Sequence, residues 1–529
     1  MTKSNPSSLF KHIIDIMNLL QALLLLCFGC TSESSNTPVF PELPELHSVL
    51  QKQAVTSQSM ETMKSFSIAL VGDVRGELEP CGCPTLPFGG FERRQTLLQQ
   101  EIKQHAPLFQ LDAGELLLKG FFSNKGEASQ IEERAKTLAQ LSKMVGVDAW
   151  TVGPSDIMAV GLENLKTLDG PPRICATWLT QEGEWIFDPF IILQKDNIRL
   201  AVIGLSDALT DPEWSDKMQY LDAQSAIQKV LPEIPKDVDL IIGLGSMDDE
   251  QATALANLIP EVALLLTTEG STYQDPNYAM QPFIIEAPSQ GRFVQMMHFR
   301  LNAPFNTPLY QEPSEQHWRN WLTAHDANPN LQMEFEELGK GRNLFFSELI
   351  PLNASYNPTE DTDITKILGE FAIKRFKLSE EIATQPTTKS EPGFAASGRC
   401  AQCHTQEIAK WTYSNHARAW ESLVNYQAQH QSDEKNTFTA TQNPECIQCH
   451  STGFGQIGGF GEVTASNIRK FKAVQCEMCH GPMKGHPNDK SIHSSIISEQ
   501  TCLPCHNEAN SPNFDFETYL PKATCQNPE

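Results

Sequence analysis

The chain has 529 residues, more than the ~100 to 200 of a typical domain, so we expect at least two domains. Hydrophobic residues make up 40% of it, with 34 prolines and 31 glycines, which is typical of a folded globular protein and excludes a disordered one. The formal net charge of −25 argues against nucleic acid and anionic membrane surfaces as partners, because both attract basic proteins.

Residues 1–30 have the pattern of an export signal. Lys3 and Lys11 precede the apolar stretch LLQALLLLCFG, which ends at Cys30. This stretch is too short for a transmembrane span but suits a secretory signal. Its end resembles a bacterial lipoprotein signal, in which the cysteine becomes the lipidated N-terminus. Lipidation at Cys30 and plain cleavage both predict export to the bacterial cell envelope, on the periplasmic side, with membrane contact only through a lipid anchor.

Residues 31–65 are rich in Ser, Thr, Pro and Gln, and we interpret them as a tether. The next region, 66–350, alternates short apolar runs with helix-like stretches, which predicts an α/β domain. The predicted strands are 67–71, 108–112, 198–205, 238–244 and 262–267, and the clearest predicted helices are 131–145 and 223–230.

Acidic side chains follow several of these strands, where α/β proteins place ligand-binding loops: Asp73, Asp112, Glu115 and Asp156. Their spacing resembles the metallophosphoesterase domain of the 5'-nucleotidase family. That resemblance implies a layered αββα fold and a site for two metals that activate water against phosphate.

The histidines of the family pattern are missing from this chain. Where the family has Asp-x-His, this chain has Asp73-Val-Arg75. Where the family has Gly-Asn-His-Asp/Glu, this chain has Gly153-Pro-Ser-Asp156. Between residues 66 and 303 the only histidines are His105 and His298, neither at a matching position, and we expect His298 to be packed in a strand. We therefore predict a non-catalytic scaffold or binding module that does not hold both metal ions, with metal-dependent phosphoesterase or nucleotidase activity as an alternative.

Two cysteines, Cys81 and Cys83, stand in a turn-rich segment close to Asp73. Thiols this close could ligate a soft metal or form a strained, redox-active disulfide. The alternative is a structural disulfide, for example between one of them and Cys175.

Residues 351–393 form a predicted bridge after the strand-like segment FFSELIPL. An amphipathic helix is expected from residue 363 to about 382, because apolar residues recur there at helical spacing. We expect its apolar face to pack on one of the flanking domains. Residues 387–393 read as the linker to the last domain.

Residues 394–529 hold four Cys-x-x-Cys-His motifs, the attachment pattern of c-type haem. In each motif the two thiols can form thioethers with the haem while the histidine becomes the proximal iron ligand. Zinc ribbons also use Cys-x-x-Cys pairs, but zinc does not require a histidine after every pair. The motifs are Cys400/Cys403/His404, Cys446/Cys449/His450, Cys476/Cys479/His480 and Cys502/Cys505/His506.

This module resembles the tetrahaem cytochrome c-554 family. The resemblance rests on the first motif followed by Trp411 and Asn415-His-Ala-Arg-Ala, on the second followed by Thr452-Gly-Phe-Gly, and on the third followed by Gly-Pro and His486. It implies a mainly α-helical module with four closely packed haems. It also implies His416 as the distal ligand of the third haem, His486 as that of the first, and an open face on the second.

The fourth haem departs from the family pattern, because no histidine follows His506. Either His493 or His430 supplies its distal ligand, or two irons are open. Two imidazoles favour electron transfer, whereas an open iron can bind a small molecule.

We therefore predict an electron carrier of the cell envelope that works with redox protein partners, and the acidity before residue 394 would suit a basic one. The alternative is a haem oxidoreductase acting on NO, hydroxylamine or nitrite at the iron held by His450.

Overall fold

The computed structural model describes residues 64–80, 88–105, 107–118, 125–209, 214, 216–247, 249–256, 258–268, 282–302, 309–311, 343–430, 439–507, 510–511 and 513–523. Cys30, Cys81 and Cys83 lie outside the described residues, as does nearly all of the predicted tether. Among the described helices, none has both the length and the hydrophobicity needed to cross a bilayer.

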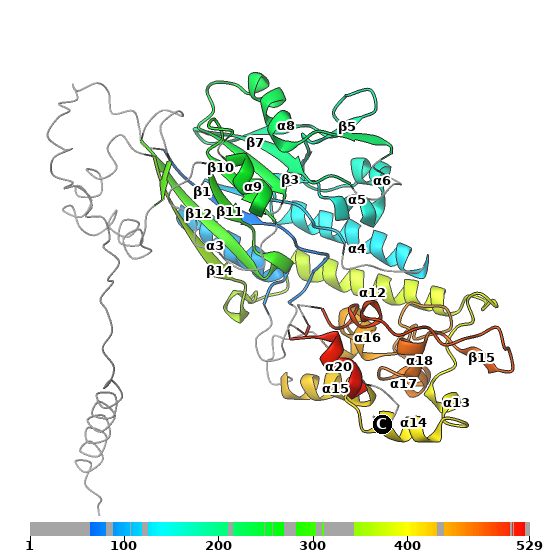
Figure 1. The fold of residues 1–529 in the computed structure, drawn as a ribbon. Helices are drawn as coiled ribbons and strands as arrows, with labels where there is room; N and C mark the ends of the chain where they lie inside the picture. The colour runs from blue at the N-terminus through cyan, green and yellow to red at the C-terminus, as the bar shows by residue number, and fades with distance from the viewer. Residues whose placement is uncertain are drawn as a thin grey trace, which may run out of the picture. The chain divides into compact units, whose positions relative to one another are not determined.

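Two β-sheets form the centre of the N-terminal domain (Figure 1). The first has the order β13-β14-β12-β1-β2-β3-β4, and the second β11-β10-β9-β7-β6. A small third sheet pairs β5 (Trp178–Thr180) with β8 (Met218–Tyr220). The strands of the first sheet are β1 (Lys64–Val71), β2 (Leu108–Asp112), β3 (Ala149–Thr151), β4 (Arg173–Ile174), β12 (Phe293–Leu301), β13 (Leu309–Gln311) and β14 (Asn343–Pro351). Those of the second are β6 (Phe190–Lys195), β7 (Ile198–Ser206), β9 (Leu240–Ser246), β10 (Leu264–Thr267) and β11 (Phe283–Glu286).

Successive side chains of a strand point to opposite faces of its sheet, and this alternation explains how the sheets and helices form layers. In β1, Ile68 and Leu70 point into a core shared by both sheets, while Ala69 and Val71 point into a second core under helices. In β7, Ala201 and Ile203 face a third core on the far side of the second sheet. The domain is therefore a helix–sheet–sheet–helix sandwich, as the sequence predicted.

Helices cover both outer faces of the sandwich. Those against the first sheet are α3 (Phe91–His105), α4 (Lys125–Met144), α5 (Pro154–Val160) and α6 (Leu162–Thr167). Those against the second are α8 (Ala223–Val230) and α9 (Asp249–Ala256). Parallel pairing of β1 with β2 and of β2 with β3 brings the carboxyl ends of these strands to one edge of the sheet.

Helix α12 (Asp363–Ala383) corrects the expectation that it packs on a single domain. Its first turns bury Ile364 and Phe371 in the core of the N-terminal domain. Farther along, Phe376 packs against the core of the C-terminal module and meets Phe454 edge to face at 5.9 Å. Figure 1 shows α12 running between α4 and α16. One helix therefore belongs to both cores.

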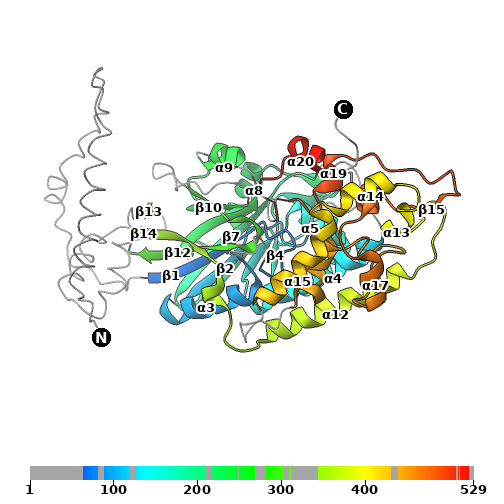
Figure 2. The same cartoon turned by 90° about the horizontal axis from the view of Figure 1, so that it is seen from below.

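The C-terminal module consists of short helices, which gather together in Figure 2. Its apolar core is small and centres on Trp420, Ile447, Phe460 and Phe471. The helices are α13 (Ser397–Cys400), α14 (Thr405–Thr412), α15 (Ala419–His430), α16 (Pro444–His450), α17 (Ala465–Phe471), α18 (Cys476–His480), α19 (Glu499–Cys502) and α20 (Phe516–Ala523), with one short strand, β15 (Lys484–Pro487).

Cys175 is a free, fully buried thiol. The suggested disulfide between Cys175 and the Cys81/Cys83 segment is therefore wrong. Burial raises the pKa of the Cys175 thiol to about 11, so this cysteine behaves as a small packed side chain.

Candidate functional site

All four Cys-x-x-Cys-His motifs line one cavity of about 2920 Å³. Each motif lies on or directly after a short helix, α13, α16, α18 or α19, and all eight cysteines and four histidines contribute to the wall. Pockets for a single small molecule or cofactor measure roughly 300 to 1,000 Å³. The cavity is therefore large enough for several cofactors, which fits the number of motifs around it.

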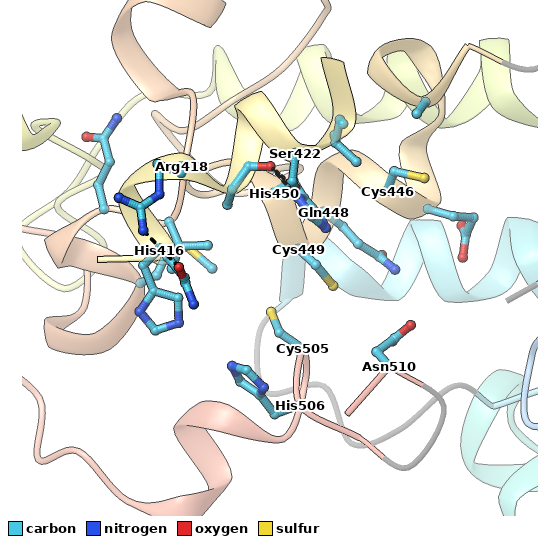
Figure 3. Close-up of a pocket in the computed structure, with 18 of the residues that line it drawn as sticks. His416, Arg418, Ser422, Cys446, Gln448, Cys449, His450, Cys505, His506 and Asn510 are labelled. Atoms are coloured by element: carbon cyan, nitrogen blue, oxygen red, sulfur yellow. Dashed lines mark hydrogen bonds between the residues drawn. The ribbon is translucent and has the colours of Figure 1, made fainter. Parts of the chain in front are cut away.

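The motifs come together in pairs. The thiols of Cys400 and Cys476 lie close enough to share a hydrogen bond, which joins the first motif to the third. The thiols of Cys449 and Cys505 do the same for the second and the fourth, and Figure 3 shows these two sulfurs directed toward each other. Cofactors attached at these cysteines would be immediate neighbours.

Three of the motif histidines have a hydrogen-bond partner at Nδ1. His450 Nδ1 lies 2.6 Å from the carbonyl oxygen of Ala419, to which it donates, and 3.2 Å from Ser422 Oγ (Figure 3). His480 Nδ1 lies 2.8 Å from Ser494 Oγ, and His506 Nδ1 lies 3.2 Å from Ser511 Oγ.

Such partners have a direct consequence for metal binding. Because Nδ1 of His450 carries the hydrogen, its Nε2 keeps a free lone pair for a metal. Burial also lowers the pKa values of His450 and His506, which favours the neutral imidazole that a metal requires. The side chains present therefore fit c-type haem.

Two further histidines stand opposite motif histidines. The rings of His404 and His486 have their centres 6.4 Å apart at an interplanar angle of 29°. Those of His416 and His506 are 6.0 Å apart. With metal–nitrogen bonds of about 2 Å on each side, two imidazoles that share one metal ion have ring centres about 6 Å apart. Both spacings suit an iron held between two histidines.

The placement of His486 agrees with the expected ligand for the first haem, whereas that of His416 differs. His416 lies beside His506 of the fourth motif, whereas the resemblance implied it as a ligand for the third haem. The reason is that the turn His416–Arg418 packs against the C-terminal segment, a tertiary contact that motif order does not reveal. A histidine thus stands opposite that of the fourth motif, where we expected His493 or His430.

His493 is exposed on the cavity wall beside Ser494, which contacts His480 on its Nδ1 side. The side chain of His430 lies outside the described residues. Within the described part of the chain, no second histidine ring stands against His450 or His480. The second and third motifs are therefore those whose histidines face no other histidine ring among the described residues.

The acidic residues of the N-terminal domain lie at the strand ends, and three of them, Asp73, Asp156 and Glu115, accept hydrogen bonds from other protein groups. Arg75 Nε donates to Asp73 Oδ1 at 2.6 Å, at the position where the family pattern has a histidine. Asp156 accepts from the backbone N–H groups of Leu116, Leu117 and Gly153 at 2.8 to 2.9 Å. Glu115 accepts from Ser246 Oγ at 2.8 Å.

This donor set does not suit two metal ions. Arg75 places a cation where the family pattern has a ligand imidazole, and Asp156 already accepts three backbone N–H groups. Burial raises the pKa of Asp112 to about 6 and that of Asp156 well above its usual range. Among the described residues, no three histidine, cysteine or acidic side chains are grouped as a metal site requires. His298 is buried in β12 and contacts Ser67 Oγ at 2.8 Å, as expected of a packed histidine.

Some functional residues at the boundary between the domains were not found from the sequence. Arg134 of α4 and Arg375 of α12 both donate to Glu445, the residue before Cys446. Asn443, which caps α16, donates to Glu79 of the N-terminal domain. No sequence motif marks these contacts.

Comparisons with known proteins divide the chain in the same way. Residues 399–481 match the family model described as cytochrome c554 and c-prime. Cytochrome c-554 of Nitrosomonas europaea is 33% identical over 99 residues, which cover 18% of this chain and 41% of that protein. A 5'-nucleotidase of Vibrio cholerae is 25% identical over 220 residues, which cover 38% of each chain. The chain thus spans about two fifths of the length of these curated relatives.

Solved structures of phosphoesterases are similar to the chain at low identity. A 5'-nucleotidase precursor from Thermus thermophilus is 17% identical, covers 61% of each chain and has a TM-score of 0.42. The calcineurin-like phosphoesterase YfkN from Bacillus subtilis is 15% identical, covers 59% of this chain and 98% of that one, and has a TM-score of 0.43. By sequence, the chain is similar to a 5'-nucleotidase in one segment and to a cytochrome c-554 in another.

The buried Asp112 predicts a pH dependence of stability. Its folded-state pKa, about 6 against a usual 3.8, means that its contribution to stability is complete below pH 3.8 and is lost as the pH rises through about 6. In the wild type, this loss should lower the free energy of unfolding by about 3 kcal/mol, since one pKa unit corresponds to about 1.4 kcal/mol. In Asp112→Asn, this decrease should be absent. The measurement is the free energy of unfolding across this pH range. Asp169→Asn, at an exposed position, is the control, and equal slopes for wild type and Asp112→Asn would contradict the prediction.

Proposed function

We propose that this protein is an exported cytochrome that transfers electrons through four covalently bound c-type haems, and that its phosphoesterase-like domain does not hydrolyse phosphate esters. The observation that carries the proposal is the pair of histidine contacts, 6.4 Å for His404 and His486 and 6.0 Å for His416 and His506, inside a cavity lined by all four motifs.

The arrangement of the motif residues supports electron transfer. A c-type haem supplies an iron that cycles between the ferrous and ferric states. His404 with His486, and His416 with His506, would hold such an iron in both states, so that little reorganisation would accompany electron movement. The contacts of Cys400 with Cys476 and of Cys449 with Cys505 bring neighbouring attachment points together and favour rapid exchange within the module.

A second function is favoured by one observation, namely that the described residues place no second histidine against His450 or His480. An iron with an open face can bind a small molecule. The alternative is therefore a haem oxidoreductase that acts on a small nitrogen compound such as NO, hydroxylamine or nitrite. His450 is the first choice for the histidine behind that iron, because its Nδ1 is fixed by a backbone carbonyl at 2.6 Å.

Export is part of the proposal, and its support comes from the N-terminal sequence. The apolar stretch before Cys30 suits a signal peptide, with Cys30 as the site of a lipid anchor. A redox protein is the partner that an electron carrier requires.

Carbon monoxide binding to the reduced protein tests the ligand assignment. We expect CO to bind two irons of the four, because His486 and His416 occupy the other two. His416→Ala should raise the number to three, whereas His493→Ala should leave it at two, since His493 stands opposite no motif histidine. The CO difference spectrum gives these numbers relative to total haem. No CO binding in the wild type, or no gain in His416→Ala, would show that the ligands are assigned wrongly.

Hydrolysis of a 5'-nucleotide in the presence of Mn²⁺ tests the other half of the proposal. We expect no phosphate release, because Arg75 stands at a metal-ligand position and backbone N–H groups occupy Asp156. The full-length holoprotein is assayed beside Asp112→Asn. Metal-dependent release that Asp112→Asn abolishes would establish a working phosphoesterase site.

A further inference from the structure

The residue before the second haem motif forms ion pairs with two arginines from outside the haem module. Glu445 directly precedes Cys446, and its side chain is 15% exposed. Arg134 from α4 and Arg375 from α12 both form ion pairs with it, and their side chains are 6% and 5% exposed. We call these three residues the charged triad.

Each arginine of the triad is fixed by further contacts. Arg134 donates to the carbonyl oxygen of Gly76 at 2.8 Å, and Arg375 donates to Gln130 Oε1 at 2.8 Å. Both guanidinium groups lie over the ring of Phe371, at 5.6 and 5.8 Å from its centre. The charges therefore have defined positions in a largely water-free environment, where electrostatic interactions are much stronger than in water.

The triad is adjacent to the second haem site. Glu445 and Gln448 line the same cavity as Cys446, Cys449 and His450, and the α-carbons of Glu445 and Cys446 are about 3.8 Å apart as chain neighbours. A second contact between the domains reaches the same helix, since Asn443 at the start of α16 donates to Glu79. The attachment helix of the second haem is thus the element that docks on the phosphoesterase-like domain.

Fixed charges beside a redox centre change its reduction potential. A positive charge stabilises the ferrous state, which carries one more electron, and a negative charge stabilises the ferric state. The two arginines of the triad would therefore raise the reduction potential of a nearby haem, and Glu445 would lower it.

We propose that the phosphoesterase-like domain sets the reduction potential of the second haem by placing the Arg134 charge, with Arg375, against Glu445. The phosphoesterase-like domain would then supply fixed charges to the cytochrome module. This inference rests on the proposed function, because it requires a haem on Cys446 and Cys449.

The test is a spectroscopic redox titration of the full-length holoprotein. Arg134→Gln should lower the potential of one haem and Glu445→Gln should raise the potential of the same haem, while the other haems keep theirs. Arg134→Lys retains the charge and should restore much of the wild-type value. Lys136→Gln, on an exposed part of the same helix where Lys136 pairs with Glu132, is the matched control and should change nothing. The responding haem is identified by its absence when Cys446 and Cys449 are both replaced by alanine.

The signs distinguish an electrostatic role from a purely structural one. Shifts in the same direction for Arg134→Gln and Glu445→Gln, or no shift in either folded variant, would overturn the inference, and thermal unfolding shows whether each variant is folded. If four haems titrate normally and none responds, only this inference fails. If the protein carries fewer haems or exchanges no electrons, the proposed function itself fails.

Discussion

The cavity shared by the four motifs is the constraint on which the rest of the structure depends. Its volume is about 2920 Å³, and the helices that the C-terminal module contributes to its wall have only four to twelve residues. Helices of this length are marginal without tertiary support. The small core around Trp420 and Phe460 provides part of that support. The remainder must come from cofactors attached to the cysteines and from the neighbouring domain, which contributes α12 and the contacts of Arg134.

In the phosphoesterase-like domain, the acidic side chains at the strand ends are engaged in contacts within the protein. Asp73, Arg75 and Glu115 still adopt positive φ angles of 49°, 49° and 55°, strained conformations that residues other than glycine adopt mainly at functional sites. Arg75 now pairs with Asp73, and backbone N–H groups bind Asp156. The rigid sandwich consequently remains available as a platform for the haem module, which docks through α16.

The sequence predicted the regular part of this fold well, because period-two and helical patterns report burial directly. Helix α8 has the predicted ends, and the predicted strands from 67–71 to 262–267 all exist. The haem motifs were equally clear, since their chemistry is local. Contacts between distant segments were not predictable: His416 lies against the fourth motif, α12 belongs to two cores, and Glu445 binds two arginines that are 70 and 311 residues away. Each depends on tertiary packing that leaves no periodic signal.

The mass of the intact protein, matured in a host that attaches c-type haem, is the most direct test of this account. We expect a mass that corresponds to four covalently bound haems. Replacing both cysteines of any one motif by alanine should lower the mass by one haem. A protein that folds with its thiols free, or that holds zinc at its cysteine pairs, would contradict the claim that haem organises the C-terminal module.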